Sequence, residues 1–144
     1  MKQIAPLEIG IPVRDLDRML SFYQQVFGCE EVRRADIPAA LSSQIGVAEH
    51  GYVNVWLKLP GGEILKLVCP PQPPETTPPP DFMAQQTGIA YFTIYCADMA
   101  AALATAESSG ASLVSQRALA EQAEGVKLAF LRDPEGNVFE LVQP

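Results

Sequence analysis

The chain has 144 residues, of which 48% are hydrophobic, so it is long enough to bury one substantial core. Its formal net charge of −7, with ten Lys and Arg residues scattered along it, excludes the basic surface that binds phosphate backbones or anionic lipids. No apolar run resembles a signal sequence or approaches the roughly 20 residues that span a bilayer. We therefore expect one soluble, cytoplasmic domain without a nucleic-acid or membrane partner.

The first half of the chain predicts strands around one helix. Alternating residues place a strand over 7–13, and apolar residues at three- and four-residue spacing predict a helix between Asp15, its N-cap, and Gly28. Further strand patterns cover residues 51–59 and 63–69. Between the helix and these strands, Ala35 to Gly51 carry an insertion that we expect to form a lid or cavity loop.

The second half repeats this order after a Pro-rich stretch. Residues 70–80, PPQPPETTPPP, should run extended as a spacer, with a proline-recognition ligand as the alternative. A strand over 89–96, a helix between Asp98 and Gly110, and strands over 126–132 and 137–143 follow.

The two halves align with each other. EIGIPVRDLDRMLSFYQQVFG from Glu8 matches YFTIYCADMAAALATAESSG from Tyr91 at an offset of 83, and PGGEILKLVCP matches PEGNVFELVQP at an offset of 74. The sequence therefore predicts a single domain over residues 1–144 with two tandem β-α-β-β-β modules. The modules cover about residues 5–70 and 86–144, with the linker at about 70–81.

Alternation along the strands predicts which side chains face away from the helices. This face collects most of the polar strand residues, and Glu8 matches Tyr91 in the repeat while Lys66 matches Glu140. A duplicated module could bring these four side chains together. On the same face we expect a substrate-binding group of Asn54, Trp56, Thr93, Tyr95, Leu128 and Phe130.

The remaining chemistry-bearing residues have plainer interpretations. Cys29, Cys69 and Cys96 are an odd number without a C-x-x-C pair, so we interpret them as reduced thiols in or near the core. His50, the single histidine, lies in the insertion and is interpreted as a loop residue.

The sequence resembles the glyoxalase/bleomycin-resistance/extradiol-dioxygenase (vicinal oxygen chelate) superfamily. Val13, Asp15, Leu16, Phe22, Tyr23 and Gly28 match one family pattern in order, and DPEGNVFEL, Asp133 to Leu141, matches the closing one. The resemblance covers nearly the whole chain. It implies an α+β fold in which paired βαβββ modules form curved mixed sheets around a cavity, and homodimers are common in the family.

The resemblance also implies four metal-ligand positions, which map to Glu8, Lys66, Tyr91 and Glu140. The family usually has His, His, Gln or Glu at the first three and Glu at the last, so Glu140 alone fits. A lysine ammonium 4 Å from a divalent ion would be repelled by about 8 kcal/mol at an effective dielectric constant of 20. We therefore expect no cofactor, with Lys66 in place of the cation and paired with Glu8 and Glu140.

Four functional hypotheses stay open at this point. The first is an isomerase or lyase of a small oxygenated molecule, with Glu8 or Glu140 as base and Lys66 or Tyr91 stabilising an enolate oxygen. The second is a binding protein that sequesters an aromatic compound, as bleomycin-resistance members do. The third is a metal-dependent glyoxalase or dioxygenase with Glu8, Tyr91 and Glu140 as ligands. The fourth is a neutralised network without function.

Overall fold

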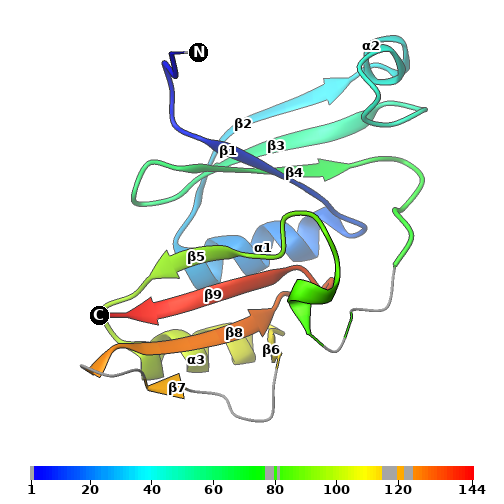
Figure 1. The fold of residues 1–144 in the computed structure, drawn as a ribbon. Coiled ribbons are helices and arrows are strands. Elements are labelled where there is room, and N and C mark those ends of the chain that lie inside the picture. The colour runs from blue at the N-terminus through cyan, green and yellow to red at the C-terminus, as the bar shows by residue number, and fades with distance from the viewer. Residues whose placement is uncertain (1, 77–79, 81, 115–119, 122–124) are drawn as a thin grey trace. The chain divides into compact units, whose positions relative to one another are not determined.

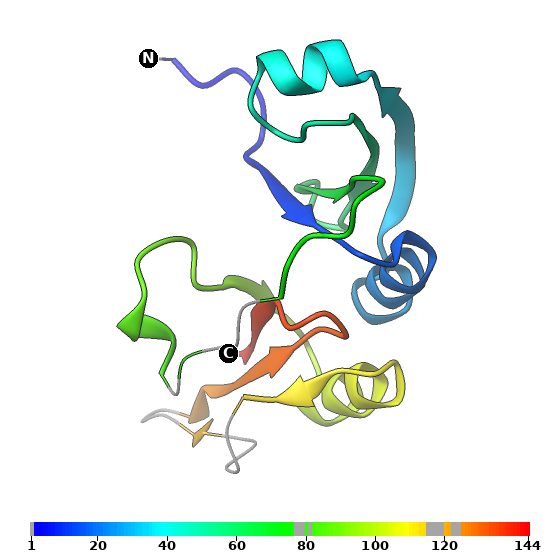
Figure 2. The same cartoon turned by 90° about the vertical axis from the view of Figure 1, so that its right-hand side faces the viewer.

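The computed structural model describes residues 2–76, 80, 82–114, 120–121 and 125–144. The chain forms two compact units, Met1–Thr76 (unit 1) and Thr77–Pro144 (unit 2). Figures 1 and 2 show that each unit consists of a sheet with one long helix along it. In the described part of the chain, no helix combines the length and the apolar character that crossing a bilayer requires.

Unit 1 contains a four-stranded mixed sheet in the order β1-β4-β3-β2. Strands β1 and β4 are parallel, and the other neighbouring strands are antiparallel. The helix α1 packs against β4. The elements are β1 (Glu8–Pro12), α1 (Leu16–Phe27), β2 (Glu30–Ile37), α2 (Ala39–Gln44), β3 (Tyr52–Lys58) and β4 (Ile64–Cys69).

Unit 2 repeats this arrangement with the order β5-β9-β8-β6, and β7 also pairs with β8. Strands β5 and β9 are parallel, and α3 packs against β9. The elements are the 3₁₀ helix η1 (Met83–Gln85), β5 (Phe92–Tyr95), α3 (Met99–Ser108), β6 (Ser112–Leu113), β7 (Ala120–Glu121), β8 (Lys127–Arg132) and β9 (Val138–Gln143). The predicted α+β fold with tandem modules is confirmed.

The strand registers of the two units agree with the sequence repeat. Gly10 is the partner of Lys66 in unit 1, and Thr93 is the partner of Glu140 in unit 2. Shifting the first pair by the two offsets, 83 and 74, gives the second pair. That the two units pack together as one domain remains a prediction from the sequence.

Both long helices begin as the sequence predicts, and α1 also ends as predicted, whereas α3 ends at Ser108 with Ser109 as its C-cap, before the predicted Gly110. The Asp15 side chain accepts a hydrogen bond from the Arg18 amide at 3.0 Å, and Asp98 accepts one from the Ala101 amide at 3.1 Å. Gly28 ends α1 with a positive φ of 65°, which glycine adopts without strain. In each unit the apolar faces of helix and sheet supply buried residues, which include Val13, Met19, Tyr23 and Leu67 in unit 1 and Met99 and Phe139 in unit 2.

Two predictions need correction. The sequence pattern did not place a strand at β2, because most of this edge strand is exposed and its register shifts between Glu31 and Arg33. The insertion from Ala35 to Gly51 is also not one loop, since it includes the end of β2 and all of α2.

The three cysteines are free thiols, as expected. Cys29 is buried, and burial raises the pKa of its thiol from the ordinary 9.0 to about 11. Burial also raises the pKa of the Cys96 thiol. Both thiols are therefore poor nucleophiles at neutral pH.

Candidate functional site

A pocket of about 590 Å³ lies in unit 1 on the sheet face opposite α1. Its size is within the usual range for small-molecule sites. Ile11, Val55 and Leu67 are buried on the helix side of the same strands, so alternation turns their neighbours toward the pocket. Three strands supply its floor, which consists of Gly10, Pro12, Tyr52, Asn54, Lys66 and Val68.

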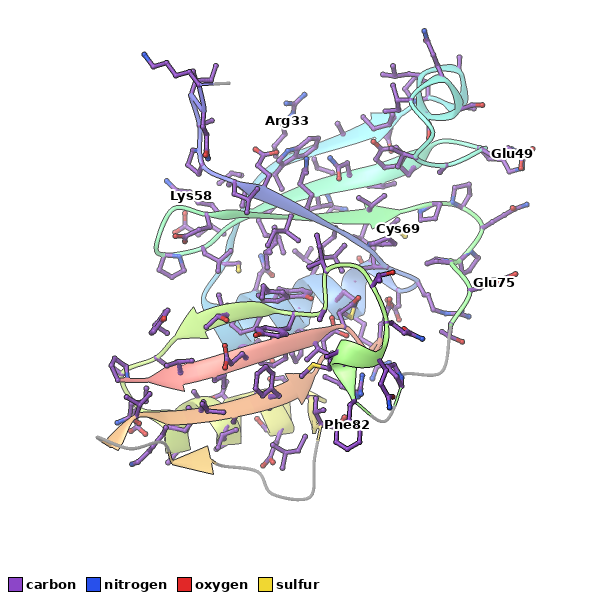
Figure 3. The ribbon with its side chains drawn as sticks, viewed as in Figure 1. Arg33, Glu49, Lys58, Cys69, Glu75 and Phe82 are labelled. Atoms are coloured by element: carbon purple, nitrogen blue, oxygen red, sulfur yellow. The ribbon has the colours of Figure 1, made fainter. Side chains whose placement is uncertain are left out.

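Two segments outside the strands form the walls of this pocket. One is the loop of residues 47–50 between α2 and β3, whose Glu49 is labelled in Figure 3. The buried Ser42 hydroxyl fixes this loop, because it donates to the Ala48 carbonyl at 2.6 Å and accepts from the Ala48 amide at 3.1 Å. The other wall is the start of the Pro-rich stretch, where Arg14 Nη1 donates to the Pro74 carbonyl at 2.7 Å.

Lys66, which lines the pocket, forms an ion pair with Glu8, which is not among the residues that line it. Lys66 lines the pocket from β4, and its Nζ lies 3.1 Å from Glu8 Oε2 on β1. Gly10 is the register partner of Lys66, so no side chain on β1 stands between the two groups. The Lys66 side chain is 30% exposed and the Glu8 side chain 41%, so solvent screens the pair and its contribution to stability is small.

Asn54 brings a buried amide to the same pocket. The residue is 5% exposed, and its Oδ1 has no hydrogen-bond partner in the structure. Buried polar atoms are nearly always paired, because an unsatisfied acceptor keeps its full desolvation cost. Because Oδ1 itself is sealed from solvent, a group that enters the pocket can become its partner only if the amide turns.

Trp56 shares the sheet face of the pocket but does not line it. It is the β3 partner of Lys66, and the Arg33 guanidinium of β2 lies 4.5 Å from its ring centroid. Arg33 is labelled in Figure 3. This cation–π contact covers part of the ring, so Trp56 is suited to report on the pocket rather than to stack on a ligand.

In unit 2 the structure brings together two pairs of the predicted site residues. Thr93 Oγ1 donates to Glu140 Oε2 at 2.6 Å, and Tyr91 meets the edge of Phe130 with ring centroids 5.0 Å apart. Tyr91 is 43% exposed and Tyr95 72% exposed.

Leu128 is half-buried in β8, two residues before Phe130 and on the same face of the strand. That residues of both units share one cavity stays a prediction.

Sequence reasoning missed much of the pocket wall. His50, interpreted as a loop residue, lines the pocket with Glu49, and its Nε2 lies 3.8 Å from Glu49 Oε2. Pro70, Pro71 and Pro74, interpreted as a spacer, line it as well. The nine-residue difference between the repeats was the available signal for the 47–50 loop, whereas composition alone could not show where the prolines would lie.

These features define a duplicated α+β protein with a small-molecule pocket on the face of one sheet. Residues 4–141 match the profile of the Glyoxalase/Bleomycin resistance protein/Dioxygenase superfamily. The chain belongs to this superfamily. The resemblance that the sequence motifs indicated is therefore confirmed.

Two plant proteins are among its curated relatives. The chain is 30% identical over 139 residues to a lactoylglutathione lyase of Arabidopsis thaliana and 28% identical to a putative lactoylglutathione lyase of Brassica oleracea var. gemmifera. Each match covers 95% of this chain and 43% of the relative. The chain thus spans less than half the length of these two proteins.

Solved structures support the fold. A glyoxalase family protein from Bacillus cereus superposes with a TM-score of 0.81 over 99% of this chain and 95% of its own, at 18% identity. Glyoxalase I from Zea mays superposes with a TM-score of 0.68 over 97% of this chain and 44% of its own, at 22% identity. At these identities the likeness concerns the fold alone.

Among the positions that the resemblance implies for metal ligands, Lys66 does not fit a divalent ion. Lys66 occupies one position with an ammonium group, which repels a cation and is already paired with Glu8. Within the described residues of each unit taken by itself, no three His, Cys, Asp or Glu side chains form a group suited to hold a metal ion.

Proposed function

We propose that this protein binds a small oxygenated organic molecule in the unit 1 pocket and moves a proton on it with Lys66 and Glu8. The observation that supports the proposal is the 3.1 Å contact between Lys66 Nζ, from the pocket floor, and Glu8 Oε2. A cation and a carboxylate at this spacing can act on one substrate, the cation on its carbonyl oxygen and the carboxylate on a proton of the neighbouring carbon. The protein would then be an isomerase or lyase that uses no divalent metal.

The chemistry follows from the two groups. The Lys66 ammonium donates a hydrogen bond to a substrate carbonyl and stabilises the negative charge that develops on its oxygen. The Glu8 carboxylate removes a proton from the carbon next to the carbonyl, which leaves an enolate. In a hydroxyketone, the removed proton returns to the former carbonyl carbon while the proton of the neighbouring hydroxyl passes to the former carbonyl oxygen, which completes an isomerisation, and the electrons stay on the substrate. Glu140, which accepts from Thr93, is the second candidate base, and Tyr91 the second candidate donor.

Hydrogen exchange on candidate substrates tests this proposal without a prior choice of product. The protein is incubated in D₂O with uncharged hydroxyketones such as dihydroxyacetone, and NMR follows deuterium incorporation next to the carbonyl. Lactoylglutathione joins the panel because the plant relatives carry that word in their names. Glu8→Gln and Lys66→Met should each slow exchange by about 10²- to 10⁴-fold.

Matched controls come from β2 and β3, on the side of the same sheet away from β1. Glu30→Gln on β2 and Lys58→Met on β3 remove exposed charges outside the pocket and should leave exchange unchanged. Parent-like exchange in Glu8→Gln and Lys66→Met would contradict the proposal.

Elemental analysis tests the metal-free part separately. Protein purified without chelator or metal-affinity tag should contain almost no divalent metal. The metal content of Lys66→His, which lacks the ammonium group, is measured for comparison. About one metal ion per chain in the parent would instead favour a metal-dependent glyoxalase or dioxygenase with altered ligands.

A second candidate function is ligand sequestration without turnover. The observation that favours it is the exposed aromatic surface of unit 2, where Tyr91 contacts Phe130 and Tyr95 is largely exposed. Aromatic compounds would then bind in calorimetric titration without being consumed.

A further inference from the structure

The charged groups around the unit 1 pocket give it a net charge that is close to zero or negative. Lys66 lines the pocket, but Glu8 lies 3.1 Å from its ammonium and offsets the charge. Glu49 adds a second carboxylate to the wall, beside His50. An anion entering the pocket would therefore meet little net attraction and would compete with Glu8 for Lys66.

The Asn54 amide gives independent evidence about the ligand. Its Oδ1 is a buried acceptor without a partner, and an acceptor is satisfied by a donor. The terminal torsion of an asparagine side chain is broad, so the amide can turn its oxygen toward the pocket when a donor arrives. A carboxylate has no donor to offer, whereas an amide N–H or a hydroxyl does.

Asn54 and Lys66 are placed to act on one ligand. They lie on adjacent strands as diagonal neighbours, because Asn54 pairs with Val68 and Trp56 pairs with Lys66. Gly10 has no side chain, so it leaves the space beside Lys66 open. A Cβ at this position would meet Val68 Cγ2 at 3.9 Å, which is an ordinary contact. One group of the ligand can thus face the amide while a neighbouring group faces the ammonium.

We propose that the pocket selects an uncharged ligand that carries a carbonyl oxygen next to an N–H or O–H donor, and that it discriminates against carboxylates. The carbonyl accepts from Lys66 and the donor satisfies Asn54. Pro12 and Val68 pack against the apolar remainder of the molecule. The inference rests on the proposed function because it assigns the substrate class of the same pocket.

Benzamide and benzoate are suitable probes because they share a ring and differ in the group that the pocket should recognise. Calorimetric titration into the full chain should give benzamide an affinity roughly tenfold higher than that of benzoate. Asn54→Leu should reduce the affinity for benzamide by a similar factor and leave that for benzoate unchanged. Thermal unfolding of each variant checks that it is folded.

Glu8→Gln provides the sharper test, because it leaves the Lys66 charge without its partner. This variant should reverse the preference, so that benzoate binds more tightly than benzamide, and Glu30→Gln on β2 should keep the parent preference. Equal affinities, tighter binding of benzoate by the parent, no binding of either probe at its solubility limit, or an unchanged preference in Glu8→Gln would overturn the inference. In both probes the carbon attached to the carbonyl carbon carries no hydrogen, so neither can be a substrate for proton removal. These binding results are therefore distinct from failure of the hydrogen-exchange assay.

Discussion

Replacing Gly10 with valine should stabilise the protein and weaken ligand binding at the same time. Gly10 lies in β1, its φ is not positive, and a Cβ there would make an ordinary contact of 3.9 Å with Val68 Cγ2. The backbone therefore does not require glycine. Because glycine costs a strand about 0.5–1 kcal/mol relative to alanine, we expect Gly10→Val to raise the free energy of unfolding by about that amount.

The new side chain would occupy the pocket space beside Lys66, which Gly10 leaves open. Forcing extra methyl groups into occupied space costs about 1–3 kcal/mol. That cost corresponds to a loss of affinity of about 5- to 150-fold. Gly10→Ala should give the same gain in stability with a smaller loss of affinity.

Urea unfolding and calorimetric titration with benzamide measure the two effects separately. Parent-like affinity in Gly10→Val would show that ligands do not use the space beside Lys66. Lower stability would show that the strand needs glycine for its backbone after all. Either result would refute the reasoning.

Three further predictions concern the rest of the chain. Ser42→Ala removes both hydrogen bonds to Ala48, so it should lower the free energy of unfolding by about 1–2 kcal/mol and weaken benzamide binding, as urea unfolding and titration would show. Asp133 is 3% exposed and accepts hydrogen bonds from the Glu135 amide and from the Asn137 amide and side chain. Asp133→Ala should therefore lower the free energy of unfolding in urea by about 2–3 kcal/mol, and a decrease of less than about 0.5 kcal/mol would contradict this role. Burial raises the pKa of Cys29 to about 11, so stability from the neutral thiol is complete below pH 9 and is lost as the pH rises toward 11. From about pH 8 to about pH 10.5 the parent should lose up to about 2 kcal/mol more than Cys29→Ala, and equal losses would contradict the burial argument.

The sequence predicted the repeat and the core well because both depend on periodic apolar residues. Asp15 and Asp98 mark helix starts by side chains that bind nearby amides, a signal that is entirely local. Alternation placed Leu67 and Val55 on the buried face for a similar reason. The edge strand β2 escaped because its residues are exposed and its register is interrupted, which leaves no apolar period to detect.

The site was predictable only in part. Face alternation identified Lys66 and Asn54 as residues of the non-helix face, and the structure places both at one pocket. The contact of Arg14 with Pro74 joins residues 60 positions apart, so no local pattern could reveal that the Pro-rich stretch lines the pocket. The placement of His50 depends in the same way on the hydrogen bonds between Ser42 and Ala48.

The residues between β2 and β3 leave and re-enter the sheet at a single point. Ile37 and Tyr52 are direct partners, so their Cα atoms are about 5 Å apart. Gly51 closes this excursion with a φ of 82°, where a Cβ would approach the Ile37 carbonyl to 2.5 Å. Residues 38–50 could thus be exchanged as a cassette for other sequences, provided that Gly51 is kept. Such grafts would change one wall of the pocket while the strand register stays fixed. This segment is therefore the part of the chain in which ligand preference can be engineered most directly.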